Sequence, residues 1–164
     1  MAEQLEVRLG KRLTELGKTI AVAESCTGGL IGHRVTDTPG SSTYFLGGVI
    51  AYSYEAKERL LNVRHRTLYE FGAVSEKTAR EMARGARRAL GADIGLAVTG
   101  IAGPGGGLPD KPVGTTWVAV SSREGDWVHL HQWEGDRSQN KMYSVDAVLT
   151  LLLDVLDNEM TPEG

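Results

Sequence analysis

Residues 19–35 read TIAVAESCTGGLIGHRV, and this stretch predicts a buried strand, a tight turn and a helix in direct succession. The first part is short and almost wholly apolar, as is typical of a strand buried inside a sheet. Two adjacent glycines mark the turn, and apolar residues at helical spacing follow it. The stretch therefore predicts one strand–turn–helix unit of an α/β fold, with Ser25 and Cys26 in its turn.

The same alternation of strands and helices continues on both sides of this unit. Strands are expected over 19–24, 45–52, 92–98, 114–121 and 127–133, and helices over 5–16, 26–36, 53–61, 75–90 and 137–156. The last two strands are joined by a short turn, which fits a hairpin and makes one strand antiparallel to its neighbours. These elements predict a three-layer α/β/α sandwich around a mixed, mostly parallel sheet of about five strands. We expect one domain over residues 1–164, with its core over 5–156 and a frayed tail over 157–164.

Composition narrows the classes of protein to consider. Lysine and arginine number 18 against 21 aspartates and glutamates, so the net charge of −3, without a long basic block, argues against a nucleic-acid partner. Cys26 is the only cysteine, which excludes an intrachain disulfide. The first residues do not resemble a signal peptide, and no stretch approaches the ~20 apolar residues of a membrane span. We therefore expect a cytoplasmic protein without a membrane partner.

Three unusual segments follow expected strands, namely 24–27, 52–57 and 99–111. Ligands of α/β sheets gather at the carboxyl ends of strands, so these segments are expected to converge on one site. Ser25 is a candidate nucleophile, because N–H groups at a helix start favour a developing negative charge. It is equally suited to capping the helix. Cys26 is a rival nucleophile, since a helix start lowers a thiol pKa, although lone cysteines are mostly buried hydrophobes.

A serine nucleophile needs a base, and the sequence offers few. His33 lies about two helical turns from Ser25, too far to reach back. His129 and His131 share one strand face at metal-binding spacing, but no third ligand is evident and surface positions explain them as well. Lys57 lies in the expected first turn of a helix, where the dipole lowers its pKa and suits it to deprotonate a serine.

Several further residues have both a functional and a structural interpretation. Tyr52 is placed to relay a proton or to position Lys57; otherwise it covers the sheet while Lys57 is solvated. The glycine-rich loop 99–113 suits an oxyanion hole or a phosphate nest, but it lacks the spacing of a P-loop or a dinucleotide fingerprint. Arg137, with Lys141 one turn later, suits an anionic group or a solvated helix start.

Four motifs occur together and in order: AESCTGG at 23–29, GGVIAYS at 47–53 with Lys57, GAVS at 72–75, and TGIAGP at 99–104 with KPVGT at 111–115. This pattern closely resembles the CinA C-terminal domain family, whose stand-alone members include amidases of nicotinamide mononucleotide. The resemblance covers about residues 5–156. One departure is Lys141, where many members carry arginine, which keeps the charge but loses bidentate phosphate binding. The chain is also expected to lack the N-terminal domain of longer CinA proteins.

The resemblance implies an amidohydrolase that converts nicotinamide mononucleotide to nicotinate mononucleotide and ammonia, in pyridine-nucleotide salvage. It implies Ser25 as the nucleophile, activated by Tyr52 and Lys57. It implies no metal, no cofactor and a homo-oligomer. Alternatives are a non-catalytic nucleotide-binding or assembly module, or an amidase for another small amide. The implied substrate-binding residues are Glu24, Thr27, Gly28, Gly48, Thr99, Gly100, Ala102, Gly103, Arg137 and Lys141.

Overall fold

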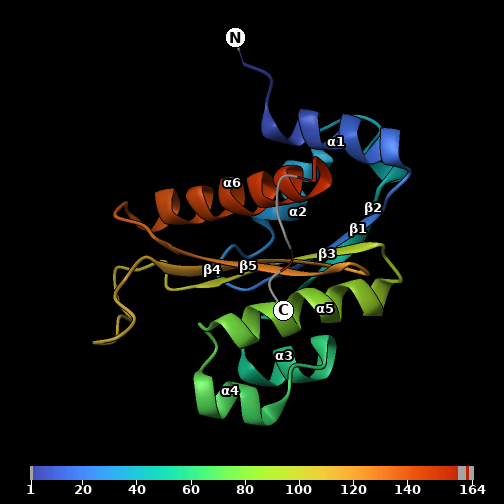
Figure 1. Ribbon diagram of the computed structural model, residues 1–164. Coiled ribbons are helices and arrows are strands. Elements are labelled where there is room, and N and C mark those ends of the chain that lie inside the picture. The colour runs from blue at the N-terminus through green and yellow to red at the C-terminus, as the bar shows by residue number, and fades with distance from the viewer. Residues whose placement is uncertain (1, 159–161, 163–164) are drawn as a thin grey trace.

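The computed structural model describes residues 2–158 and residue 162. Its sheet lies between two layers of helices (Figure 1). One face is covered by α1 (Leu5–Leu16), α2 (Leu30–Thr36) and α6 (Arg137–Leu156). On the other face α5 (Glu76–Leu90) packs on the sheet, and α3 (Tyr54–Leu61) and α4 (His65–Phe71) pack on α5. The predicted α/β/α sandwich is confirmed. The tail predicted over 157–164 lies mostly outside the described residues.

The sheet has five strands in the order β2-β1-β3-β4-β5. Their bounds are β1 Ile20–Glu24, β2 Phe45–Ile50, β3 Ile94–Gly100, β4 Thr115–Ser122 and β5 Gly125–Gln132. β1 pairs in parallel with β2 and β3, while β4 is antiparallel to β3 and β5. The chain therefore runs from β1 to β2 on one side and later to β3 on the other. The carboxyl ends of three parallel strands meet at this switch point, where α/β sheets bind ligands.

Two local predictions are wrong. The helix expected from residue 26 begins at Leu30, because Gly28 and Gly29 have φ values of 59° and 110°, which do not continue a right-handed helix. The segment around His65, expected to be a loop, is α4, whose buried residues Thr67 and Leu68 give it a face on the protein interior. Such a short helix carries too weak a periodic signal to be recognised from sequence.

Two helix starts place side chains that matter below. Ser53 is the N-cap of α3 and its Oγ accepts a hydrogen bond from the N–H of Ala56, so Lys57 falls in the first turn as predicted. Asp136 and Gln139 form a reciprocal capping box at the start of α6. This box makes Arg137 the first residue of that helix.

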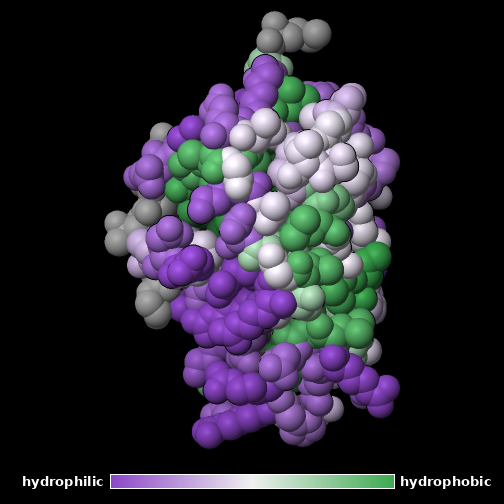
Figure 2. All heavy atoms as spheres, turned by 90° about the vertical axis from the view of Figure 1, so that its right-hand side faces the viewer, coloured by the Kyte–Doolittle hydropathy of each residue, from purple (hydrophilic) through white to green (hydrophobic). Residues whose placement is uncertain are grey.

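Apolar side chains gather on the side of the molecule where β2 lies (Figure 2). β2 is an edge strand, and its Leu46 and Ile50 are 45% and 56% exposed. Charged side chains are missing from this strand, although charges commonly protect a sheet edge from pairing with another chain. The β2 edge therefore lacks this charged protection. Within the described residues, no helix is long and apolar enough to cross a membrane.

Candidate active site

Ser25 and Lys57, which are 32 residues apart in the sequence, meet at the carboxyl end of β1. The Nζ of Lys57 lies 2.9 Å from the Oγ of Ser25. Two backbone hydrogen bonds bring the strand ends together: the N–H of Ser25 donates to Val98 in β3, and the N–H of Ala51 after β2 donates to Glu24. The predicted pair of a serine and a lysine is therefore in direct contact, through the convergence of strand ends that the sequence predicts.

The amine of Lys57 is enclosed by protein, since the side chain is only 1% exposed. Burial lowers the pKa of Lys57 from 10.5 to about 8, and the nearby thiol of Cys26 acts weakly in the opposite direction. Nζ also donates to the backbone carbonyls of Ala51 and Tyr52, both at 2.9 Å. When the amine is neutral, these carbonyls hold its two N–H groups, and its lone pair is left to accept the Ser25 hydroxyl proton. Burial is thus the cause of the lowered Lys57 pKa, in place of the helix dipole expected from the sequence, and it suits this lysine to act as a base.

Tyr52 contributes to the site through its backbone. Its carbonyl accepts the hydrogen bond from Lys57, whereas its side chain is 64% exposed. The phenol oxygen lies 3.5 Å from the Nη2 of Arg137. The backbone contact with Lys57 supports the interpretation that Tyr52 positions this lysine. The phenol of Tyr52 lies near Arg137 of α6 instead.

The turn that carries Ser25 is held by the carboxylate of Glu24. Its Oε1 accepts from the Thr27 hydroxyl at 2.7 Å and from the N–H groups of Gly29 and Ile31, and its Oε2 accepts from Gly32. The first-turn N–H groups of α2 are thus occupied by Glu24. The expectation that these groups favour a negative charge at Ser25 is wrong, because a carboxylate already neutralises them.

Cys26 points into the core rather than toward a substrate. It belongs to the apolar cluster formed with α1, α2 and α6. Burial raises the pKa of the Cys26 thiol to about 11, although Lys57, Lys141 and Arg137 are near enough to oppose that shift. A buried thiol with a raised pKa is a poor nucleophile, which favours Ser25.

Backbone N–H groups close to Ser25 are candidates for an oxyanion hole. The N–H of Gly28 donates to the carbonyl of Ser25, and that of Gly29 donates to Glu24. Among the described residues, no backbone carbonyl accepts a hydrogen bond from the N–H groups of Cys26 and Thr27. These two groups directly follow Ser25, the candidate nucleophile, and acyl-transfer enzymes place oxyanion donors at such positions.

The third segment approaches from the end of β3. Thr99 is buried and its hydroxyl donates to the carbonyl of Ala73, and Gly100 packs closely against Thr116. The carbonyls of Ala102 and Gly103 accept hydrogen bonds from Asn140 and Arg137, respectively. These contacts attach the glycine-rich loop to α6. Binding of substrate by Thr99, Gly100, Ala102 and Gly103 stays a prediction.

Gly48 lies in β2, where it pairs with Val22 of the neighbouring strand β1. A Cβ at this position would come within 2.4 Å of the Val22 side chain, so glycine is needed there for the close approach of the two strands. Gly28 lies nearer to the cations of α6, because a Cβ there would be 4.0 Å from the Nζ of Lys141. Binding of substrate by Gly28, by Gly48 or by the engaged side chains of Glu24 and Thr27 remains untested.

Two cations from α6, Arg137 and Lys141, lie close enough to Cys26, the neighbour of Ser25, to act on its thiol pKa. Arg137 donates from Nη1 to the carbonyl of Gly103 at 2.6 Å, which orients the guanidinium while leaving further N–H groups available. Lys141 lies one turn later, beside Gly28. Among the described residues, neither cation has an acidic partner within 4.0 Å. With Lys57 they form a positive cluster suited to an anionic ligand.

Asn140 is a residue of the site region that sequence reasoning missed. Its amide nitrogen donates to Ala102 and its amide oxygen accepts from the N–H of Gly135, although the residue is almost fully buried. It thus joins the glycine-rich loop to the segment that precedes α6. The available signal was a polar amide within an apolar helical pattern, which indicates a buried hydrogen-bonding role.

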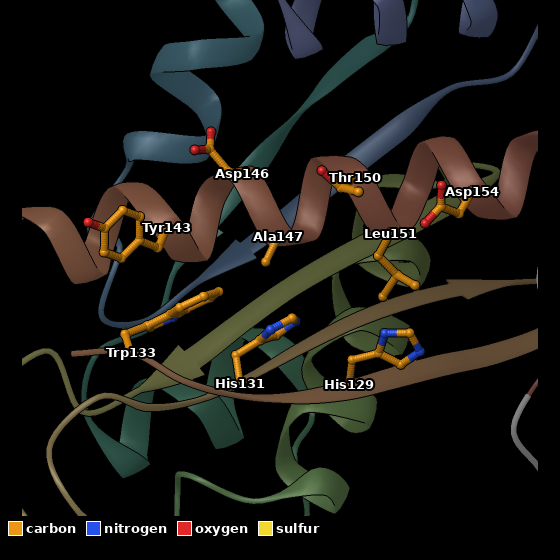
Figure 3. A pocket seen from close by; sticks show the side chains of 9 residues that line it. All are labelled: His129, His131, Trp133, Tyr143, Asp146, Ala147, Thr150, Leu151 and Asp154. Carbon is orange, nitrogen blue, oxygen red and sulfur yellow. The ribbon is translucent and has the colours of Figure 1, made fainter. Parts of the chain in front are cut away.

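His129 and His131 line a different hollow. Figure 3 shows the two histidines of β5, together with Trp133 directly after that strand, facing α6. The groove that these side chains line has a volume of about 490 Å³. The His131 ring stacks on Trp133 with centroids 4.7 Å apart, and burial followed by the charge of His129 lowers the pKa of His131. Neither Ser25 nor Lys57 lines this groove. In the part of the chain that the structure describes, no cluster of three or more His, Cys, Asp and Glu side chains is arranged to hold a metal ion.

Known proteins with similar sequences and structures are found. A sequence model of the family described as CinA C-terminal domain matches residues 2–156. A CinA-like protein from Desulfotalea psychrophila is 50% identical over 144 residues, and a putative competence-damage inducible protein from Halothermothrix orenii is 52% identical over 145 residues. Each alignment covers 88% of this chain but 35% of the relative, so the chain spans about a third of these relatives.

Solved structures share the fold over almost the full length of both chains. The competence/damage inducible protein CihA from Agrobacterium tumefaciens is 40% identical, with a TM-score of 0.89 and 93% of each chain covered. A CinA superfamily protein from Klebsiella pneumoniae 700603 is 33% identical, with a TM-score of 0.91 over 94% of this chain and 96% of that one. These matches agree with the α/β architecture described above.

Proposed function

Because the chain belongs to the family of CinA C-terminal domains, we propose that it is an amidohydrolase that converts nicotinamide mononucleotide to nicotinate mononucleotide and ammonia. The observation that carries the proposal is the 2.9 Å contact between Ser25 Oγ and the buried amine of Lys57. A hydroxyl beside a desolvated lysine is the pairing that nucleophilic amide hydrolysis requires. The family resemblance supplies the substrate.

The reaction then runs in two halves. Neutral Lys57 takes the Ser25 proton as Oγ attacks the carboxamide carbon, and the resulting oxyanion is held by the N–H groups of Cys26 and Thr27. The protonated amine returns its proton to the leaving nitrogen, so that ammonia departs and a nicotinoyl ester remains on Ser25. Water attacks this ester while Lys57 accepts a proton, and collapse of the second intermediate releases the carboxylate and restores the Ser25 hydroxyl.

The cations of α6 support recognition of the nucleotide phosphate. The remaining N–H groups of Arg137 suit a phosphate with two acceptor oxygens, and Lys141 adds a second positive charge. In this proposal the phosphate is bound between them, beside Gly28, where a side chain would occupy space near Lys141. The carboxamide then extends toward Ser25. The Tyr52 phenol, next to Arg137, lines the same approach.

The test of the function is an ammonia-release assay on nicotinamide mononucleotide, with nicotinate mononucleotide identified as the second product. A panel of other amides, including free nicotinamide and the riboside, separates this substrate from a different small amide. Binding of the nucleotide without turnover would instead favour a non-catalytic module. The proposal also includes pyridine-nucleotide salvage, a cytoplasmic setting and a homo-oligomer, the last of which light scattering of the purified chain measures.

The activity is expected to depend on pH through Lys57. The catalytic form is the neutral amine, and its pKa is about 8. Below that value log(kcat/KM) should therefore rise by about one for each pH unit, and above it should level off. Initial rates measured between pH 6 and pH 10 check this. A midpoint near the ordinary lysine value, or a rate that falls as pH rises through 8, would contradict the assignment of the base.

Replacing Arg137 with methionine is expected to raise KM by about 10–100-fold with a much smaller change in kcat, because hydrogen bonds to a charged group are lost without touching the reacting atoms. Steady-state kinetics on nicotinamide mononucleotide measure the change. The control substrate is nicotinamide riboside, which lacks the phosphate and should respond to Arg137→Met by less than about threefold. An equal loss on both substrates would remove Arg137 from phosphate recognition.

A further inference from the structure

Glu24 carries a buried carboxylate that the proposed reaction does not use. It is the last residue of β1, directly before Ser25, and only 2% of it is exposed. Within the described residues, none of the ion pairs involves this carboxylate. Its charge is instead met by four hydrogen-bond donors at 2.7–3.1 Å. Burial of a carboxylate is unfavourable unless its lone pairs are satisfied in this way, so the arrangement is a specific one.

The four donors lie within the turn that follows Ser25 and at the start of the helix after it. Thr27 donates its hydroxyl from within the turn, while Gly29, Ile31 and Gly32 donate backbone N–H groups from the start of α2. The N-cap position of α2 is Gly29, which offers no capping side chain. Glu24 therefore replaces the missing cap from outside the helix and links the end of β1 to the first turn of α2.

This link matters because the turn itself has little stiffness. Gly28 and Gly29 both have positive φ, and adjacent glycines leave a chain with more conformations than other residues do. Ser25 is joined to this flexible segment on its C-terminal side. A displacement of about 1 Å between a nucleophile and its base is enough to slow catalysis severely. Something must therefore hold the turn, and among the described side chains the Glu24 carboxylate accepts the most hydrogen bonds from the turn and the helix start after it.

We propose that Glu24 is a positioning residue, which holds the turn so that Ser25 Oγ stays in contact with Lys57 Nζ and the N–H groups of Cys26 and Thr27 stay in place. This inference rests on the proposed role of Ser25 as the nucleophile. For Glu24, a positioning role takes the place of the substrate-binding role that the family resemblance implies, because both carboxylate oxygens already accept hydrogen bonds within the protein. Thr27 takes part in the same task through its hydroxyl.

The variant that tests this is Glu24→Gln, which keeps the size of the side chain. Its amide oxygen can still accept from Thr27, Gly29 and Ile31, but its NH₂ group would face the N–H of Gly32. We expect kcat to fall by about 10–100-fold, with KM within about twofold of the parent. The pH midpoint should stay near that of the parent, because the surroundings of Lys57 are unchanged.

The readout that separates positioning from overall stability is the rate at which a fluorophosphonate probe phosphonylates Ser25, with a bond from Oγ to phosphorus formed, fluoride released and the hydroxyl proton taken by Lys57. This reaction needs an aligned nucleophile and base but no nucleotide. Glu24→Gln is expected to slow it by about 10–100-fold per folded molecule, as judged by circular dichroism. Glu81→Gln is the matched control: Glu81 is also a buried carboxylate that accepts from a threonine hydroxyl and a backbone N–H, but its partners belong to α4 and the residue before it. This control should react within about twofold of the parent.

Several outcomes would overturn the inference. A parental phosphonylation rate in folded Glu24→Gln would reduce Glu24 to a structural role. A rise in KM alone would restore it to substrate binding, and a displaced pH midpoint would make it a titrating participant. If Glu24→Gln does not fold, Thr27→Val decides: it removes one of the four hydrogen bonds to Glu24, and an unchanged phosphonylation rate would overturn the inference. A parent chain that the probe labels at Ser25 but that leaves nicotinamide mononucleotide intact contradicts the proposed substrate, while the probe still decides the role of Glu24.

Discussion

Replacing Ser25 with alanine is expected to lower kcat for ammonia release from nicotinamide mononucleotide by at least ~10³-fold, because the covalent route then has no nucleophile. Cys26 cannot substitute for it, since its thiol is buried and its pKa is raised to about 11. A coupled ammonia assay on purified protein measures the loss. Thermal unfolding should be almost unchanged, as alanine removes only a hydroxyl.

The matched comparison is the neighbouring residue. Cys26→Ala is expected to keep most of the activity, at the cost of some stability for a small cavity in the apolar cluster. A serine mechanism would fail if Ser25→Ala released ammonia at the parental rate. The reverse result, with activity lost only in Cys26→Ala, would transfer the nucleophile to the thiol.

Replacing Lys57 with methionine is expected to lower kcat by at least ~10³-fold and to abolish the rise of the rate around pH 8, because the proton acceptor is removed. Methionine has a similar length and no charge, so it fills the same buried space. Removal of a buried ammonium offsets the loss of the two hydrogen bonds to Ala51 and Tyr52. The unfolding temperature should therefore stay within about 5 °C of the parent.

Rates across pH 6–10, together with a thermal melt, check this second prediction. Lys11→Met is a suitable control, because it removes a lysine that lies on the surface, 65% exposed, away from the site. Retention of the parental pH profile in Lys57→Met would show that another group accepts the Ser25 proton.

The alternation of apolar segments was sufficient to predict the layers and the sheet. Each of the five strands overlaps its predicted range, and α3 and α5 begin one residue after the starts predicted at Ser53 and Ser75, which are their N-caps. Periodicity reports reliably on elements long enough to repeat it. It failed for α4, which is only seven residues long, and at α2, where positive φ at two glycines delays the helix.

The candidate site was predictable in part. The sequence predicted that segments after β1, β2 and β3 converge, and it named Ser25 and Lys57, which the structure brings into contact. It did not predict that Tyr52 acts through its carbonyl, or that Glu24 occupies the N–H groups at the start of α2. Both depend on the direction in which a side chain or a carbonyl points, and a pattern of residue types does not contain that direction.

The amino-acid sequence by itself determined most of the segments that become strands and helices, the order of the motifs, and Ser25 and Lys57 as candidates for a nucleophile and its base. Those properties follow from local spacing and from residue chemistry. The tertiary structure alone decided that Lys57 is buried, which lowers its pKa to about 8, and that two carbonyls orient its amine. Desolvation depends on atoms contributed by distant segments, so it arises only when β1, the end of β2 and α3 close around one lysine.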